Sequence, residues 1–155
     1  LRSWPYESRL DDRHPVAISI EEDEMISDLQ EHECYELLSS TTVGRIGFVR
    51  DGQVHILPMN YRTTDRGLLL RTSSSGVLRR LAGDDSAVSF EVDFHDDLGG
   101  TGWSVLMHGT LRIVSEEEPP ETQTPPSPWA GPDRETPLRF TIDSITGRRV
   151  RRERH

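Results

Sequence analysis

The chain has 155 residues, a hydrophobic share of 33% and a net charge of -9. This length suits one domain with a single core, and the acidic charge excludes a general attraction to nucleic acid or to an anionic membrane. Neither a membrane-spanning apolar run nor a signal-peptide core is evident, and a single cysteine excludes an internal disulfide, so we expect a cytoplasmic protein.

The first part of the chain shows no regular pattern. Residues 1–26 carry scattered charges and two prolines, and we expect an arm that lies on the surface or on a partner subunit. The pattern changes at Ser27 and Asp28, two residue types that favour helix N-caps. Apolar residues, Cys34 among them, then recur at helical spacing, so the sequence predicts a helix over 29–39.

Hydrophobic alternation beyond this helix predicts an antiparallel sheet. Asp51-Gly52 stands between two β-prone runs, and both residues suit the positive φ angles of a tight hairpin turn. Pro58 cannot donate to a strand ladder and should lie at an edge, a bulge or a gap, whereas Gly109 indicates a bend or bulge. The predicted strands cover 43–50, 53–61, 68–72, 87–94, 103–114 and 138–142, with a short helix over 77–82.

A proline-rich segment interrupts the strands near the end of the chain. Residues 115–137 hold seven of the ten prolines, which predicts a long irregular excursion rather than a second domain. We therefore expect one domain over 27–150, followed by a basic tail at 151–155. Because no βαβ alternation is present, the order of elements predicts a mainly β fold, a small antiparallel barrel with short helices at its ends.

Several patterns that could carry chemistry are better explained otherwise. Asp93, His95, Asp96 and Asp97 cluster at a strand end, but no metal-ligand spacing supports them, so a solvated turn is the better interpretation and we expect no metal site. Cys34 lies on the apolar stripe of its helix, where a cysteine packs as a small hydrophobe. The chain also has no GxSxG nucleophile elbow, so neither residue type supports covalent catalysis.

The arginines after residue 147 form a basic patch without aromatic neighbours. Nucleic-acid binding therefore ranks last among the functional hypotheses.

The stretch RTSSSGVLRRL, residues 71–81, leaves two interpretations open. Its hydroxyls and Gly76 precede a predicted helix start, where free backbone N–H groups attract anions, and Arg71 and Arg79 or Arg80 could supply charge-assisted bonds. It lacks both the Walker and the GxGxxG spacing. Taken alone, N-cap serines with a solvated arginine pair are the better interpretation of the stretch.

Short segments in a fixed order and spacing connect the chain to a known family. They are ECYELL (33–38), VGRIGF (43–48), PMNY (58–61), LLLRT (68–72), VSFEVDFHD (88–96), GWSV (102–105), PWAGP (128–132) and ITGRR (145–149). Through them the chain resembles the pyridoxamine 5'-phosphate oxidase-like, flavin-binding split-barrel family, and in particular its small actinobacterial flavoproteins. The resemblance implies a six-stranded antiparallel split β-barrel that forms a homodimer, with FMN or alternatively a deazaflavin in each interface cleft.

The resemblance also implies which residues hold the cofactor. One group would follow the isoalloxazine edge, largely through backbone atoms, another would face the ribityl phosphate, and a third would come from the strand lining the cleft. In that order they are Pro58, Met59, Asn60 and Tyr61; Arg71, Thr72, Ser73, Ser74, Ser75 and Arg79; and Trp103 and Ser104. The sequence assigns no catalytic residue, which suits a protein whose flavin does the redox chemistry.

One departure from the family pattern divides the functional hypotheses. Val77 stands where the family usually has a lysine, and the chain contains no lysine at all. The first hypothesis is a flavin-dependent oxidoreductase acting on an unidentified small molecule. The alternative, which Val77 favours, is a non-catalytic or degenerate module that binds flavin, deazaflavin or haem.

Overall fold

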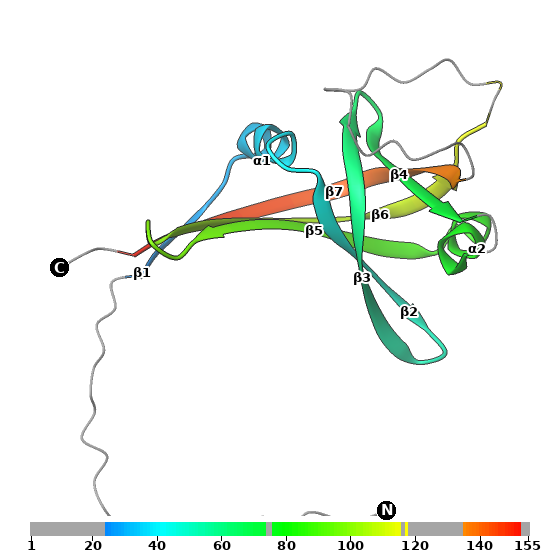
Figure 1. Ribbon diagram of the computed structural model, residues 1–155, viewed down its shortest axis with the longest axis horizontal. Helices are drawn as coiled ribbons and strands as arrows, with labels where there is room; N and C mark the ends of the chain where they lie inside the picture. Colours follow the sequence, from blue (N-terminus) through cyan, green and yellow to red (C-terminus); the bar gives the residue numbers. More distant parts are fainter. Residues whose placement is uncertain (1–23, 74–75, 116, 118–134, 153–155) are drawn as a thin grey trace, which may run out of the picture.

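The computed structural model describes residues 24–73, 76–115, 117 and 135–152. Seven strands and two short helices make up most of these residues, as Figure 1 shows. In chain order they are β1 (Glu24–Asp28), α1 (Glu31–Leu38), β2 (Val43–Arg50), β3 (Gln53–Thr64), β4 (Gly67–Ser73), α2 (Val77–Gly83), β5 (Ala87–Asp96), β6 (Thr101–Ile113) and β7 (Glu135–Arg152).

Six of the strands form a closed antiparallel ring. The sheet order is β1-β7-β4-β3-β2-β5-β6, and a further pairing between β7 and β6 closes it. β1 lies outside the ring, paired with the last residues of β7. The predicted fold class, a six-stranded antiparallel split barrel with short flanking helices, is confirmed.

The core fills the inside of the ring because alternate residues of each strand point inward. Phe90 lies at its centre, with Tyr61 edge-on at 5.5 Å between ring centroids and Phe140 tilted at 5.9 Å. The other fully buried side chains are Cys34, Leu38, Ile46, Leu68, Leu70, Val92, Val105, Met107, Leu111 and Leu138.

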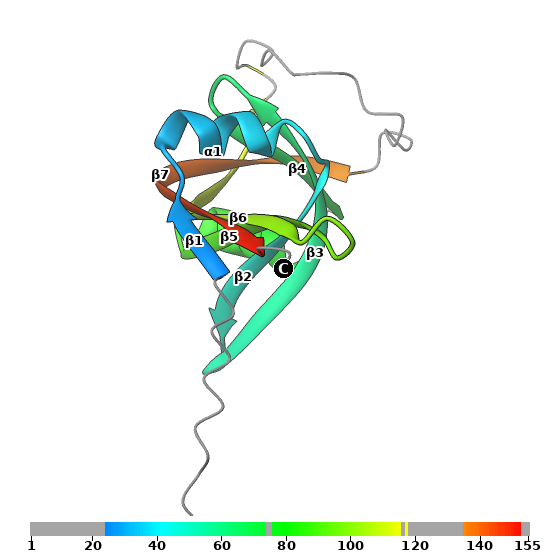
Figure 2. The same ribbon diagram turned by 90° about the vertical axis from the view of Figure 1, so that its left-hand side faces the viewer.

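The two helices lie at opposite ends of the barrel (Figures 1 and 2). α1 closes one end with Cys34 and Leu38, and α2 closes the other with Leu78, Leu81 and Ala82. Neither described helix is long and apolar enough to cross a membrane.

The start of the first helix differs from the sequence prediction. Ser27 and Asp28 belong to β1, where they pair with Arg149 and Arg148 of β7, so they do not cap the helix. Gln30 is the N-cap instead, and its backbone N–H donates to the carboxylate of Glu33 at 2.7 Å. The predicted start was wrong because strand pairing with a distant segment outcompetes local capping propensity.

The predicted backbone turns are confirmed. Asp51 and Gly52 have φ angles of 51° and 73°, as a tight hairpin between β2 and β3 requires. The register between β6 and β7 shifts at His108/Gly109, which is the expected bulge. A side chain at Gly109 would overlap the carbonyl oxygen of Thr141, so the bulge depends on the glycine.

The last strand is much longer than expected. β7 runs through all of Glu135–Arg152, whereas the sequence predicted a strand over 138–142 only. The strand passes through Gly147. A side chain at that position would come within 2.6 Å of the Cys34 sulfur, so the glycine is what lets α1 pack on the strand. Residues 24–26 of the predicted arm and 151–152 of the predicted tail are therefore in the sheet, while 1–23, 118–134 and 153–155 lie outside the described residues.

Candidate functional site

A gap in the ring lies between β3 and β4. The two strands pair only from Tyr61–Leu70 to Thr64–Gly67. Before Tyr61, β3 pairs with β2 alone, and after Leu70, β4 pairs with β7 alone. Two groups of sequence-predicted residues therefore flank the same opening, 58–60 on β3 and 71–73 on β4.

The edge of β3 offers backbone groups to this gap. The Tyr61 N–H donates to the Thr42 carbonyl at 2.8 Å, on the β2 side of the strand. Because backbone groups alternate along a strand, the N–H and C=O of Asn60 and the C=O of Pro58 point the other way, where no described strand pairs with them. Proline fits here because its missing N–H is not needed for the ladder, so the predicted gap at Pro58 is confirmed.

The side chains of the β3 group divide between two faces. Tyr61 is buried, and its hydroxyl donates to the Leu38 carbonyl at 2.6 Å; burial raises the pKa of this phenol far above its usual value. Met59 is half-buried and packs against the core. Pro58 and Asn60 are exposed on the outer face. Met59 and Tyr61 thus serve the barrel with their side chains, and their backbone groups face β2. The backbone groups open to a ligand at the gap are those of Pro58 and Asn60.

The β4 group leads directly into α2. Arg71 is exposed, and Thr72 shares a face with the buried Leu68 and Leu70, so these two side chains point to opposite faces of the strand. Gly76, which has no side chain to cap the helix, precedes the first turn of α2. Arg79 is exposed on this helix. Ser74 and Ser75 lie outside the described residues, and of Ser73 only the backbone is described.

Trp103 and Ser104 lie far from the gap. Both are near the start of β6. Arg71 lies beside the other end of β6, because Arg71 pairs with Pro137 of β7 and the Val114 N–H donates to the carbonyl of the same Pro137. Eleven residues of strand separate the two places, about 36 Å along β6 at the usual rise per residue. Trp103 follows the inward face and stacks on Phe94 at 6.5 Å, while Ser104 points to the outer face. One protomer therefore does not bring all of the predicted cofactor residues together.

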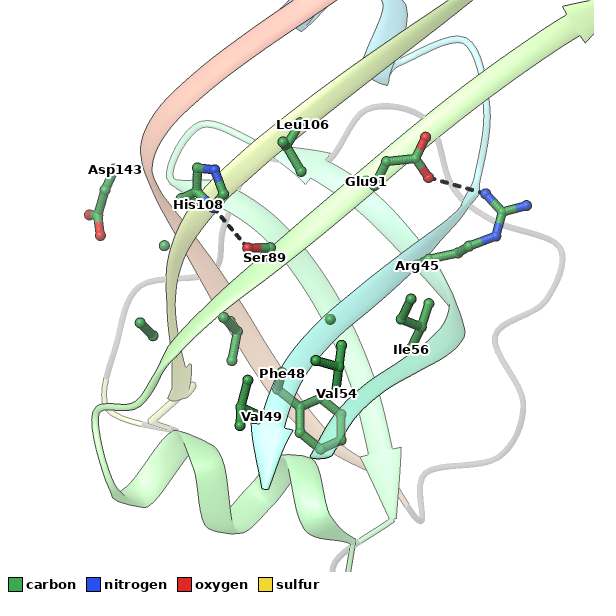
Figure 3. Close-up of a pocket in the computed structure, with 14 residues that line it drawn as sticks. Arg45, Phe48, Val49, Val54, Ile56, Ser89, Glu91, Leu106, His108 and Asp143 are labelled. Atoms are coloured by element: carbon green, nitrogen blue, oxygen red, sulfur yellow. Dashed lines mark hydrogen bonds and ion pairs between the residues drawn. The ribbon is translucent and has the colours of Figure 1, made fainter. Parts of the chain in front are cut away.

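The structure also contains a hollow that the sequence did not predict. It lies on the outer face of β3, β2, β5 and β6, has a volume of about 580 Å³, and has Gly47 in its floor, so we call it the Gly47 pocket. Figure 3 shows it with Val54 and Ile56 from β3 on one side and Ser89 and His108 from β5 and β6 on the other. Its remaining lining includes Arg45, Val49, Glu91, Leu106 and Asp143. A glycine inside a predicted strand was the one available signal.

An ion cluster forms one rim of the Gly47 pocket. Arg45 Nη1 lies 3.1 Å from Glu91 Oε2 and 2.8 Å from Asp93 Oδ1. The Arg45 side chain is 52% exposed, so these contacts orient it more than they stabilise the fold. Burial raises the pKa of the Glu91 carboxyl and the neighbouring Asp93 charge adds to the effect, although Arg45 acts in the opposite direction.

A second polar pair lies further along the same face. Ser89 Oγ and His108 Nδ1 are 2.8 Å apart, and either atom can be the donor. When the serine hydroxyl donates, the imidazole proton is on Nε2, which can then donate to a further acceptor. Both residues line the Gly47 pocket.

The acidic strand end does not gather metal ligands. His95 Nε2 and Asp97 Oδ1 are 3.9 Å apart, and the side chains of both residues are largely exposed. Among the described residues, no group of three or more His, Cys, Asp and Glu side chains could hold a metal ion. Cys34 is buried against the barrel, and burial followed by the Glu33 charge raises the pKa of its thiol.

Comparisons with known proteins identify relatives over most of the chain. Residues 30–149 match the family model described as pyridoxamine 5'-phosphate oxidase. An uncharacterized protein of Mycobacterium tuberculosis is 29% identical over 130 residues, which are 81% of this chain and 86% of that protein. The solved structure of an FAD binding protein from Mycobacterium smegmatis is 33% identical, with a TM-score of 0.65 over 82% of this chain and 100% of that one. A putative pyridoxamine 5'-phosphate oxidase from Corynebacterium glutamicum shares the fold, with 24% identity and a TM-score of 0.60 over 83% of this chain and 96% of that one.

Proposed function

Because the chain belongs to the pyridoxamine 5'-phosphate oxidase family, we propose that it binds a flavin at the β3–β4 gap and acts as a flavin-dependent oxidoreductase on a small molecule. The observation that carries the proposal is the gap itself, with backbone groups of Pro58 and Asn60 on one side and Arg71 on the other. The relative from Mycobacterium smegmatis that binds FAD supports a flavin. The resemblance to the family implies FMN, with deazaflavin as the runner-up. FMN and FAD share the ring, the ribityl chain and its phosphate.

The residues at the gap fit the ring end of a flavin. A bound isoalloxazine accepts and releases electrons, and it needs a flat slot with a few donors and acceptors at its pyrimidine edge. The N–H of Asn60 and the carbonyl groups of Pro58 and Asn60 point into the gap and have no strand partner among the described residues. These groups are held rigidly because β3 pairs with β2 on its other side.

The residues after the gap fit the phosphate end less completely. Arg71 is exposed and Gly76 offers no side-chain cap to α2. Among the described residues, a guanidinium and the backbone N–H groups of the first turn are therefore the candidate donors to an anion. Val77 packs against the core, which accounts for an apolar residue where the family usually has a lysine. Arg79 and Arg80, both exposed on α2, are the remaining cations of this end.

We further propose that the working form is a homodimer. In one protomer, about 36 Å of strand β6 separates Trp103 from the strand end beside Arg71, a longer stretch than a single isoalloxazine and ribityl phosphate can span. In a symmetric dimer, the Trp103 end of one copy can meet the Arg71 end of the other, so that each cleft draws on both copies.

The competing proposal is a non-catalytic module of the same fold that binds flavin, deazaflavin or haem. Val77 is the observation that favours it, because an apolar residue there leaves the phosphate to arginines alone. This proposal shares the binding gap with the first and differs in the absence of turnover.

Purification and cofactor analysis test these proposals directly. We expect a yellow protein whose released cofactor is identified by chromatography and mass as FMN or FAD. Arg71→Ala should weaken flavin binding by about 10- to 100-fold, the usual loss for a charge-assisted hydrogen bond. Arg50→Ala, which removes a partly exposed arginine at the β2–β3 hairpin, should not weaken it. A colourless protein that takes up neither flavin nor deazaflavin would refute flavin binding, and a flavin that no reductant or acceptor can cycle would favour the non-catalytic module.

A complementation experiment tests the dimer. Arg71→Ala and Trp103→Ala should each weaken flavin binding in both clefts of a homodimer. If the two variants are unfolded together and refolded, random pairing should restore about a quarter of the wild-type flavin content, because half of the dimers then hold one intact cleft. A monomer by light scattering, or a mixture that binds no more flavin than either variant alone, would refute the shared cleft.

A further inference from the structure

The Gly47 pocket begins where the proposed flavin site ends. Pro58 of β3 pairs with Arg45 of β2, which pairs with Glu91 of β5, so these three residues form one row across the outer face. The next outward row is Ile56, Gly47, Ser89 and His108. A molecule in the pocket therefore lies within about 7 Å, two residues of strand, of the edge that Pro58 offers to the gap.

The shape of the pocket suits a flat apolar molecule. Gly47 leaves the floor bare, since a Cβ at that position would have no atom closer than 3.9 Å. The walls are aliphatic, with Val54 at 73% and Ile56 at 64% exposure, and Leu106 at 39% on the opposite side. Apolar walls of this kind favour the binding of an apolar ring, because the contact buries apolar surface. They disfavour an ion, because the ion would lose its hydration without gaining a partner.

The charges around the pocket disfavour an anion. Arg45 is the one cation in its described lining, and its Nη1 is already bonded to Glu91 and Asp93. Glu91 and Asp143 line the pocket as well, so carboxylates outnumber the guanidinium. A phosphate ester placed here would meet repulsion from both carboxylates and would lose its water for little return.

One side chain that can donate a hydrogen bond faces this apolar surface. His108 Nδ1 lies 2.8 Å from Ser89 Oγ. With the serine hydroxyl as the donor of that bond, the proton of the imidazole is on Nε2, which can donate to a ligand. A carbonyl oxygen is the acceptor that such a donor can satisfy without adding charge to the pocket.

From these observations we propose that the Gly47 pocket is the substrate site, and that it takes an uncharged, flat, largely apolar carbonyl compound whose oxygen accepts from His108. This inference rests on the proposed flavin site, which lies next to the pocket. It separates this protein from an enzyme that acts on a phosphorylated vitamin, because the pocket lacks the cations that a phosphate ester requires.

Direct binding of small probes to the full chain tests the proposal without turnover. We would titrate 1-tetralone, an uncharged bicyclic ketone, and 1-naphthyl phosphate, an anion of similar ring size, by calorimetry. We expect 1-tetralone to bind at least tenfold more tightly than the phosphate. Equal or tighter binding of 1-naphthyl phosphate would overturn the substrate class.

Two variants locate the binding in this pocket. Gly47→Leu should reduce 1-tetralone binding at least tenfold, because the new side chain fills the floor, while Gln53→Leu adds the same side chain to the same hairpin outside the pocket and should change nothing. If the leucine variant fails to fold, Gly47→Ala fits the measured space and should give a smaller loss in the same direction. Unchanged binding in the folded Gly47 variants would place the probe elsewhere and overturn the proposal.

The role of His108 needs its own control. His108→Phe should weaken the binding of 1-tetralone several-fold but leave the binding of tetralin, the hydrocarbon without the carbonyl, unchanged. Equal losses for both probes would refute the hydrogen bond.

Flavin content measured in each sample keeps the two proposals apart, since a protein that binds 1-tetralone but no flavin refutes only the proposed function. A change of oligomeric state in Gly47→Leu, with no probe bound by the wild type, would show that a second copy fills the pocket and would overturn the proposal.

Discussion

Replacing Tyr61 by phenylalanine separates the structural role of this residue from its place beside the gap. The Tyr61 hydroxyl donates to the carbonyl of Leu38 at 2.6 Å, and Leu38 is the last residue of α1. Carbonyl groups at a helix C-terminus have no partner within the helix, so Tyr61 satisfies one of them from β3. The substitution leaves that buried carbonyl without a donor and changes little else, because the ring remains packed against Phe90.

The expected cost follows from the burial of the pair. Tyr61 is 3% exposed and Leu38 is fully buried, so water cannot replace the lost donor. An unsatisfied buried acceptor costs about 1–3 kcal/mol, and we expect about 2 kcal/mol in the free energy of unfolding. In a chain of this length that corresponds to a fall in Tm of about 4–8 °C. Flavin affinity should remain within a factor of two or so of wild type, since the lost hydroxyl faces the core.

Urea unfolding followed by circular dichroism measures the effect, and Tyr35→Phe is the matched control. Tyr35 is 42% exposed, so its substitution should change the free energy of unfolding by less than about 0.5 kcal/mol. A loss in Tyr61→Phe no larger than in the control would refute the assigned role of the hydrogen bond. A large loss of flavin affinity with no loss of stability would show that the hydroxyl serves the ligand instead.

The same residue predicts a dependence on alkaline pH. Burial raises the pKa of Tyr61 in the folded protein, whereas in the unfolded chain the phenol ionises near pH 10. Above that pH the unfolded state therefore binds fewer protons than the folded state, and stability should fall by about 1.4 kcal/mol per pH unit from this residue. The difference between wild type and Tyr61→Phe should shrink over the same range, and a difference that stays constant above pH 10 would contradict the assignment.

Two further predictions concern the barrel itself. Gly109→Ala should cost about 3 kcal/mol or more in the free energy of unfolding, because its Cβ overlaps the Thr141 carbonyl at the bulge. Gly83→Ala is the control: its Cβ meets nothing within 4 Å, so it should change the free energy of unfolding by less than about 1 kcal/mol. Similar values for the two variants would contradict the bulge geometry. The Cys34 thiol, buried and with its pKa raised, should react with a thiol reagent at pH 8 only after unfolding, and fast labelling of the folded protein would contradict its packing.

Much of the barrel could be predicted from local sequence. Alternation of apolar and polar residues determines which face of a strand enters the core, so β2, β5 and most of β6 were expected within a few residues of their observed bounds. Asp51-Gly52 determines the hairpin because few other residues adopt two successive positive φ angles. Pro58 marked the gap for the same kind of local reason, since proline lacks the donor that a central strand needs.

The tertiary structure decided features that depend on residues far apart in the chain. Ser27 and Asp28 have the chemistry of a helix cap, but pairing with β7 places them in a strand. Gly147 weakens a strand when taken alone, yet Cys34 approaches so closely that only a glycine there lets β7 continue beneath α1. Local propensity amounts to a few tenths of a kcal/mol per residue, and the burial and pairing gained from a distant partner exceed it.

The candidate site divides in the same way. The sequence by itself determined the residue types at the gap, from Pro58 to Asn60 and from Arg71 to Thr72, and the barrel brought those two segments to one opening. Only the tertiary structure decided that Trp103 lies at the other end of the barrel and that Gly47, Ser89 and His108 form one row across a hollow. That row joins β2, β5 and β6, and its residues become neighbours only through strand register, which long-range packing determines.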